Sequence, residues 1–378
     1  MQTVFDFYDQ EEIEGYLSEI ESMLRKGHNP EKIQASLGIE CFEEMLNLAK
    51  ARMKNEKTGE KLYMGLEDLR FATHQDVADY RASRLRCETI IDVGCGVGLQ
   101  SIAFAKTCSK VIAIEVDERK ARYAEENFKK LGLKNVELIK DEAIKSAKKI
   151  KKADIIFCDT ERAAEETERS LETLRPNIKE LMKAYSKLTK DFCIEIPPQI
   201  RDLKIKCEKE YLSIDGKLNR LDLYFGNLAK SEYSAVSLPS KERVEGKTQK
   251  SQKKSEKALR YVYEVDEAVV KAGLTSNITP KGCLLYSEER QTLLTSEKHA
   301  SSPFFTKTYK VLATCDPTQD KITNGLKKSG AGSVVLRAKV KPEEYWSEKK
   351  KYETGMTGNK KLYLFVTSKE ALIAEIIS

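Results

Sequence analysis

Hydrophobic positions follow three successive patterns along the chain. Up to residue 66 they recur at helical spacing, as in residues 5–26, and a further helix start is indicated at Asn29-Pro30. This pattern predicts a helical region over residues 1–66. It contains no motif that indicates chemistry.

From about residue 88, short apolar runs alternate with amphipathic stretches, which predicts a parallel sheet with helices on both faces. The predicted strands are ETIIDVGC (88–95), KVIAIEVD (110–117), VELIKDE (136–142), ADIIFCDT (153–160) and FCIEIPP (192–198). Two alternating runs then flank Asp215-Gly216, which is typical of a hairpin turn.

The third pattern begins with a polar, lysine-rich stretch that predicts an exposed linker over residues 241–257. Beyond it, strand and helix patterns alternate again, which predicts a small, separate βαβαβ-like domain. We therefore expect an α/β protein with three folded parts: the N-terminal helices, a Rossmann-like domain over residues 67–240, and a smaller α/β domain over residues 258–378.

Composition narrows the class of protein. The chain has 378 residues, of which 40% are hydrophobic and 33% charged, and no apolar run approaches the roughly 18 residues of a membrane span. The N-terminus is acidic and lacks a signal-peptide pattern. Nine scattered cysteines without a CxxC pair, and only three histidines, favour free thiols over disulfides or a metal site. We expect a soluble cytoplasmic protein.

Charge is distributed unevenly. The formal net charge is +6, but residues 241–378 contain 26 Lys and Arg against 17 Asp and Glu. A basic C-terminal part indicates a polyanionic partner such as RNA, with a solvated lysine-rich surface as the equal alternative.

Distinctive residues follow four of the predicted strands, where open parallel sheets bind their ligands. They are Asp92, Gly94, Cys95, Gly96 and Gly98 after the first strand, Glu115 and Val116 after the second, Asp141, Glu142 and Ala143 after the third, and Asp159 after the fourth. The glycines allow close approach of a ligand to the backbone. A strand-end turn or a helix cap is the alternative for each acidic residue alone.

Together, these four strand ends resemble those of the class I S-adenosylmethionine-dependent methyltransferases. The resemblance implies S-adenosylmethionine as the cofactor, Glu115 on the ribose hydroxyls and Asp141 near the adenine amino group. An NAD-dependent dehydrogenase is the alternative, but the glycine loop lacks the G-x-G-x-x-G spacing because residue 99 is Leu.

The segment LRFATHQDVADYRASRL (69–85) resembles the one before the glycine loop in trimethylguanosine synthase-like RNA methyltransferases and in methyltransferases with a C-terminal THUMP-like domain. It implies that Phe71, Thr73 and His74 pack over the cofactor, with a core aromatic as the alternative for Phe71. The end of the chain resembles the THUMP-like domain, which implies RNA binding. Tyr345 and Trp346 are candidates for stacking on a base, although packing against the sheet is the favoured interpretation.

The resemblance implies that the residues after the fourth strand face the substrate, so Asp159, Thr160 and Arg162 are the catalytic candidates. The Asp-Pro-Pro-aromatic pattern of amine-methylating relatives is absent here, since Thr160-Glu161-Arg162 follows Asp159. The leading hypothesis is methylation of tRNA or rRNA. The alternatives are a protein or small-molecule substrate, and a non-catalytic RNA-binding protein. Glu195, beside the Pro197-Pro198 turn, is a weaker candidate for a base.

Overall fold

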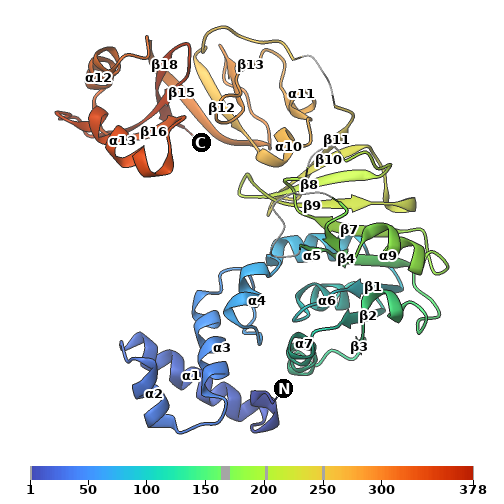
Figure 1. The fold of residues 1–378 in the computed structure, drawn as a ribbon. Helices are drawn as coiled ribbons and strands as arrows, with labels where there is room; N and C mark the ends of the chain where they lie inside the picture. Colours follow the sequence, from blue (N-terminus) through green and yellow to red (C-terminus); the bar gives the residue numbers. More distant parts are fainter. Residues whose placement is uncertain (1, 163–170, 201–202, 249–251, 378) are drawn as a thin grey trace. The chain divides into compact units, whose positions relative to one another are not determined.

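A computed structural model describes residues 2–162, 171–200, 203–248 and 252–377, and Figure 1 draws its ribbon. Contacts divide the chain into two compact units. Unit 1 comprises Met1–Cys207 and Asp222–Lys230, and unit 2 comprises Glu208–Leu221 and Ser231–Ser378. This division differs from the predicted boundaries at residues 66 and 240. The N-terminal helices belong to unit 1, and the two units divide within the predicted hairpin.

The N-terminal region of unit 1 is helical, as its periodicity predicts. Its elements are η1 (Val4–Asp6), α1 (Gln10–Arg25), α2 (Pro30–Leu37) and α3 (Phe42–Lys54). Asp9 and Glu12 form a reciprocal capping box at the start of α1, and the Asn29 side chain caps α2. The buried faces of these helices share one core with Phe128 and Tyr123 of α7 (Glu118–Lys130), which is why they form no separate unit.

Unit 1 contains a parallel sheet in the order β7-β4-β1-β2-β3, with β9 beside β7. Its strands are β1 (Thr89–Val93), β2 (Lys110–Glu115), β3 (Val136–Lys140), β4 (Ile155–Asp159), β7 (Phe192–Ile196) and the end of β9 (Lys217–Tyr224). All five predicted strands are present. Four of them are short apolar runs that are buried because helices cover the sheet, whereas the edge strand β3 is partly exposed.

Unit 1 contains further short helices, of which α4 (Leu66–Phe71) and α5 (Gln75–Arg84) precede β1, α6 (Leu99–Ala105), α8 (Ala143–Ser146) and α9 (Ile178–Tyr185) lie between strands, and η2 (Gly226–Leu228) follows β9. After β4, the two-residue strands β5 (Glu161–Arg162) and β6 (Leu174–Arg175) pair with each other. Arg169, which the sequence offers as a phosphate contact or as a surface partner of nearby glutamates, lies outside the described residues.

Unit 2 begins with four strands in the order β11-β10-β8-β9. The hairpin β8 (Glu208–Ile214) to β9 turns at Asp215 and Gly216, whose positive φ angles of 49° and 74° fit the predicted turn. The strands β10 (Tyr233–Leu238) and β11 (Glu242–Gly246) are antiparallel partners. Residues 242–246 of the predicted linker therefore form a sheet strand, because Arg243 pairs with the buried Glu208 and Glu210 of β8.

The rest of unit 2 is a seven-stranded sheet in the order β13-β14-β12-β15-β18-β17-β16. Its elements are β12 (Tyr261–Val265), α10 (Glu267–Lys271), α11 (Thr275–Ile278), β13 (Leu284–Ser287), β14 (Leu293–Ser296), β15 (Phe305–Cys315), α12 (Gln319–Lys328), β16 (Ala331–Ala338), η3 (Pro342–Glu344), α13 (Tyr345–Glu353), β17 (Lys360–Val366) and β18 (Ala371–Ile376). The expected parallel βαβαβ arrangement is reduced to one pair, β16 and β17, and the other pairs are antiparallel. No helix in the described ranges is long and apolar enough to span a bilayer.

Candidate methyl-transfer site at the strand ends of unit 1

The glycine loop between β1 and α6 has open backbone at Gly96, where nothing lies within 4 Å of the position that a Cβ would take. Gly94, Gly96 and Gly98 have φ angles of 75°, 57° and 92°, a region that side chains disfavour. A Cβ on Gly98 would lie 2.6 Å from the Phe128 ring, so this position admits only glycine without rearrangement. Cys95 is buried within the loop. We find that the loop has the shape expected for close approach of a ligand.

Asp92 lies in β1, two residues before Gly94 of the loop, and is almost fully buried. Its carboxyl accepts a 2.5 Å hydrogen bond from the Ser101 hydroxyl of α6. Burial raises the pKa of Asp92 to about 7, although the Ser101 hydrogen bond lowers it. Asp92 therefore holds the loop to α6 and is poised between its charged and neutral forms near neutral pH.

Glu115 ends β2 and connects the second strand end to the glycine loop. One carboxylate oxygen accepts from the Gly96 N–H at 2.8 Å, and the other accepts from the Val116 and Asp117 N–H groups at 2.9 Å. These hydrogen bonds fix a negative charge against the loop. The apolar Val116 beside it is 68% exposed, which provides an uncovered face next to the carboxylate.

The third strand end is more exposed to solvent than the first two. Asp141 accepts from the Glu142 N–H at 2.7 Å and pairs with Lys149 at 2.5 Å, and the hydrogen bond from Lys149 lowers the pKa of Asp141. Glu142 pairs with Lys145, and the Ala143 carbonyl accepts from the Tyr185 hydroxyl. Asp141 is therefore ionised and stands at the same sheet edge as Glu115, since β2 and β3 are parallel neighbours.

The fourth strand end holds the residues that we expect to face the substrate. Asp159 ends β4 beside Glu195 of β7, and its carbonyl oxygen lies 3.5 Å from where a Gly94 Cβ would be. Thr160 is buried, and its hydroxyl donates to the Glu195 carbonyl at 2.7 Å, so Thr160 ties two strand ends together. The side chain of Arg162 lies outside the described part of the structure.

The segment before the sheet divides between surface and core. Phe71, the last residue of α4, is 64% exposed, with the Arg70 guanidinium 5.3 Å from its ring, so it is not the core aromatic of the alternative interpretation. Thr73 is buried. His74 caps α5 by accepting from the Asp76 N–H at 3.3 Å.

A buried cluster of charged side chains around Arg81 includes Glu195, the cross-strand neighbour of Asp159. The sequence analysis did not identify Arg81 as a functional residue. Arg81 of α5 is fully buried and donates to both oxygens of Asp222 at 2.8 and 2.7 Å. The same guanidinium pairs with Glu195 at 2.6 Å and stacks over Phe157. We call Arg81, Asp222, Glu195 and Gln100, whose side-chain oxygen is 3.5 Å from Arg81, the arginine cluster. Val77, Arg81 and Leu85 share one helical face, and this spacing was the available signal.

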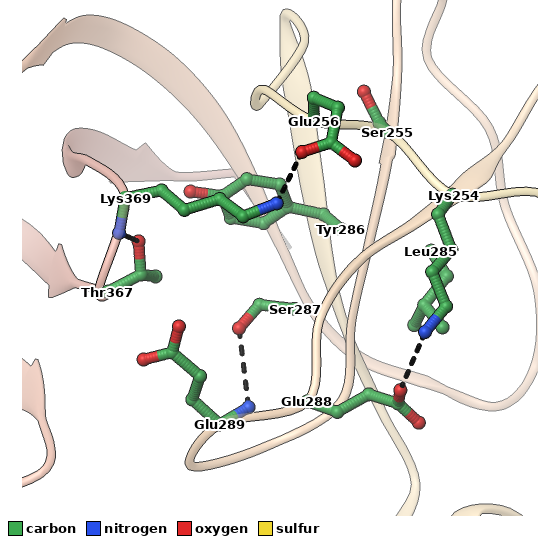
Figure 2. A pocket seen from close by; sticks show the side chains of 10 residues that line it. All are labelled: Lys254, Ser255, Glu256, Leu285, Tyr286, Ser287, Glu288, Glu289, Thr367 and Lys369. Carbon is green, nitrogen blue, oxygen red and sulfur yellow. Dashed lines mark hydrogen bonds and ion pairs between the residues drawn. The ribbon is translucent and has the colours of Figure 1, made fainter.

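Two other hollows in the described residues are weaker candidates for a functional site. Figure 2 shows a pocket in unit 2 where Lys369 pairs with Glu256 and Lys254 with Glu288, so the lining charges largely pair with one another. A second hollow lies between Ile144 and Ala147 of the α8 region and Ala184 of α9. Within the described ranges, no three His, Cys, Asp or Glu side chains are grouped to hold a metal ion.

Comparison with known proteins decides the class of the domain in unit 1. Residues 86–260 match a protein family described as a methyltransferase domain. This part of the chain is a class I S-adenosylmethionine-dependent methyltransferase domain. Its cofactor is therefore S-adenosylmethionine.

Individual relatives cover less of the chain. Ribosomal protein L11 methyltransferase of Caldanaerobacter subterraneus is 36% identical over 33% of this chain and 41% of its own length. A probable ribosomal RNA small subunit methyltransferase A of Methanosphaera stadtmanae is 41% identical over 15% of this chain and 21% of its own length. The chain thus spans less than half of each of these relatives.

One solved structure shares the fold of nearly the whole chain. The crystal structure of a putative methyltransferase from Porphyromonas gingivalis W83 aligns with a TM-score of 0.76. It covers 97% of this chain and 98% of its own length at 16% identity, which relates the folds alone.

The strand-end residues fit the cofactor. The glycine loop has room for a ligand against its backbone, the Glu115 carboxylate is held at the loop for hydroxyl groups, and Val116 and Phe71 offer exposed apolar faces. The cofactor supplies an electrophilic methyl group bound to a sulfonium. The protein's part is to bind it and to orient a nucleophile, since displacement depends on alignment.

Proposed function

We propose that the protein transfers a methyl group from S-adenosylmethionine to RNA, either tRNA or rRNA. The observation that supports the reaction is the joint placement of the glycine loop, Glu115 and Asp159 at one sheet edge. In this proposal Gly94–Gly98, Glu115 and Asp141 bind the cofactor. Asp159 accepts a hydrogen from the substrate nucleophile, held in place through Thr160 and Glu195.

The basic C-terminal domain supports RNA as the substrate. Residues 305–378 contain 14 Lys and Arg against 8 Asp and Glu. We infer that this seven-stranded domain is a THUMP-like module that presents RNA to unit 1, with affinity that depends on salt because lysines release counterions from phosphates.

A protein substrate is the second candidate, and the acidic strand ends favour it. Asp92, Asp159, Glu195 and Asp222 belong to adjoining strands. Arg81 pairs with Glu195 and Asp222, and the Asp159 carboxylate at the strand end suits a protein amine. The similarity to an L11 methyltransferase agrees with this candidate.

The test is transfer of labelled methyl groups from S-adenosylmethionine to RNA and, separately, to ribosomal proteins, both purified from a strain that lacks this gene. We expect label in RNA, and mass spectrometry of nucleosides then identifies the base. Label in protein alone would establish the second candidate. Label in neither, with the cofactor bound, would reject both. Asp159→Asn is the matched inactive variant.

A further inference from the structure

Helix α13 carries the one tryptophan of the chain on its outer face. Trp346 is 72% exposed, contrary to the favoured expectation that it packs against the sheet. Tyr345 and Tyr352 anchor the helix by packing on the core of β16 and β17. Tryptophan is enriched where protein surfaces meet a partner, and this exposed ring is available for such a contact.

The indole is held in place by its neighbours. Its ring stands edge to face with Tyr345, with centroids 5.4 Å apart at 84°, and the Lys349 ammonium lies 5.2 Å from the Trp346 ring centroid. Lys349 is fixed in turn by Glu353 at 3.4 Å, and Glu353 accepts from the Val334 N–H at 2.8 Å. A rigid aromatic loses little conformational freedom when it stacks on a ligand.

Further lysines lie along α13 and just beyond its end. Lys350 lies four residues after Trp346 and therefore on the same face of α13, where it is exposed. The Lys327 ammonium of α12 lies 3.8 Å from where a Cβ on Gly355 would be, just beyond the end of α13. We call Trp346, Lys349, Lys350 and Lys327 the α13 surface. Favourable interaction of lysines with the C-terminal end of a helix accounts for part of this pattern, but not for the exposed indole.

We propose that the α13 surface binds a single-stranded segment of RNA, with one base stacked on Trp346 and the adjoining phosphates on Lys350 and Lys327. Stacking on an aromatic ring tolerates any base, and lysines attract the backbone without reading sequence. An acidic protein partner would satisfy the lysines but not require a planar group against the indole. This inference rests on the proposed RNA substrate, and it assigns the contact to specific residues.

The single tryptophan makes the test direct. Full-length protein is titrated with a 12-nucleotide oligouridylate at low salt, while its intrinsic tryptophan fluorescence and the anisotropy of a labelled oligonucleotide are both measured. A stacked base quenches the indole, so we expect saturable quenching that follows the anisotropy. Trp346→Ala is expected to weaken binding about 5- to 100-fold. Trp346→Phe should restore part of the affinity, and Lys281→Gln, at an exposed lysine outside α12 and α13, should not change it.

Several outcomes would overturn the inference. Binding by anisotropy without quenching places the RNA elsewhere, and unchanged affinity of Trp346→Ala does the same. A fluorescence change with ribosomal proteins and not with RNA would assign the surface to a protein. The proposed function fails separately, because it is judged by methyl transfer and by the Asp159→Asn variant. Urea denaturation of Trp346→Ala checks that unit 2, which carries the substitution, remains folded, and calorimetry with S-adenosylmethionine checks the same for unit 1.

Discussion

The charges of the strand-end site and those of the α13 surface are held in opposite ways. In unit 1, Asp92, Glu115 and Arg81 are buried, and each has partners at defined hydrogen-bond distances. In unit 2, Lys350 is exposed to solvent on one short helix. Buried charges must be compensated individually, whereas exposed charges act together through a screened field. We therefore expect single substitutions to have large effects in the first region and small, additive effects in the second.

The largest expected effect is at the centre of the arginine cluster. Arg81→Met leaves the buried carboxylates of Asp222 and Glu195 without this cation, which should lower the free energy of unfolding by ~3–5 kcal/mol. Urea denaturation of the full chain measures the change. Arg86→Met removes an exposed arginine just after α5 and should change stability by less than ~0.5 kcal/mol. Equal effects of the two substitutions would remove the contrast between buried and exposed charges.

The next largest effect is expected in the pH dependence of the free energy of unfolding, to which Asp92 contributes. Burial raises its folded pKa to about 7, whereas the unfolded chain ionises near the ordinary value of ~3.9. Between these values the folded state keeps a proton that the unfolded state has lost, so stability falls as pH rises and levels off above pH ~7. Relative to Asp92→Asn, the wild-type protein should lose ~2–3 kcal/mol between pH 5 and 7, at ~1.4 kcal/mol per pH unit.

Denaturation of both proteins at pH 5, 6 and 7 provides this comparison. Asparagine is a suitable match because its amide oxygen can still accept from the Ser101 hydroxyl. Parallel stability curves for the two proteins would show that Asp92 ionises normally in the folded state.

The sequence predicts those parts of the structure that depend on local patterns, and it does not predict those that depend on contacts between distant residues. Short apolar runs identify the five parallel strands, and their ends place Glu115 and Asp159 at one edge, because a parallel sheet brings strand ends together. The partners of Arg81 lie 114 and 141 residues away in the chain, so no local pattern contains them. The sequence also does not predict that Trp346 is exposed, because α13 has apolar residues on more than one face and only packing decides which face is covered.

Unit 2 shows a second limit of sequence reasoning. Alternating strand and helix patterns suggested parallel βαβ units over residues 305–366, but β18 inserts between β15 and β17 and makes most of the sheet antiparallel. Strand order depends on contacts between distant residues, and the apolar pattern of each strand is the same in either arrangement. The edge strand β11 was missed because its residues are polar, and it is held by Arg243 and backbone pairing.

A smaller effect is expected at Glu115, which we propose to bind the cofactor. Glu115→Gln replaces an acceptor-only carboxylate by an amide whose nitrogen cannot accept from Gly96, Val116 or Asp117. It also removes the charge available to hydroxyl groups, so affinity for S-adenosylmethionine should fall about tenfold, or ~1.4 kcal/mol. Isothermal titration calorimetry measures it, with the exposed Glu118→Gln as the matched control. A Glu115→Gln protein that binds as tightly as the Glu118→Gln protein would exclude Glu115 from the cofactor site.

The smallest effect is expected on the α13 surface. Lys350→Gln removes one exposed charge, so the free energy of unfolding should change by less than ~0.5 kcal/mol. Its effect should appear instead in the salt dependence of binding to oligouridylate, where loss of one phosphate contact reduces the slope of log K against log salt by ~0.7. Lys281→Gln leaves that slope unchanged if the contact belongs to α13. A Lys350→Gln protein that is strongly destabilised would mean that this lysine is part of the folded framework, and the contrast between compensated buried charges and additive exposed ones would then not extend to unit 2.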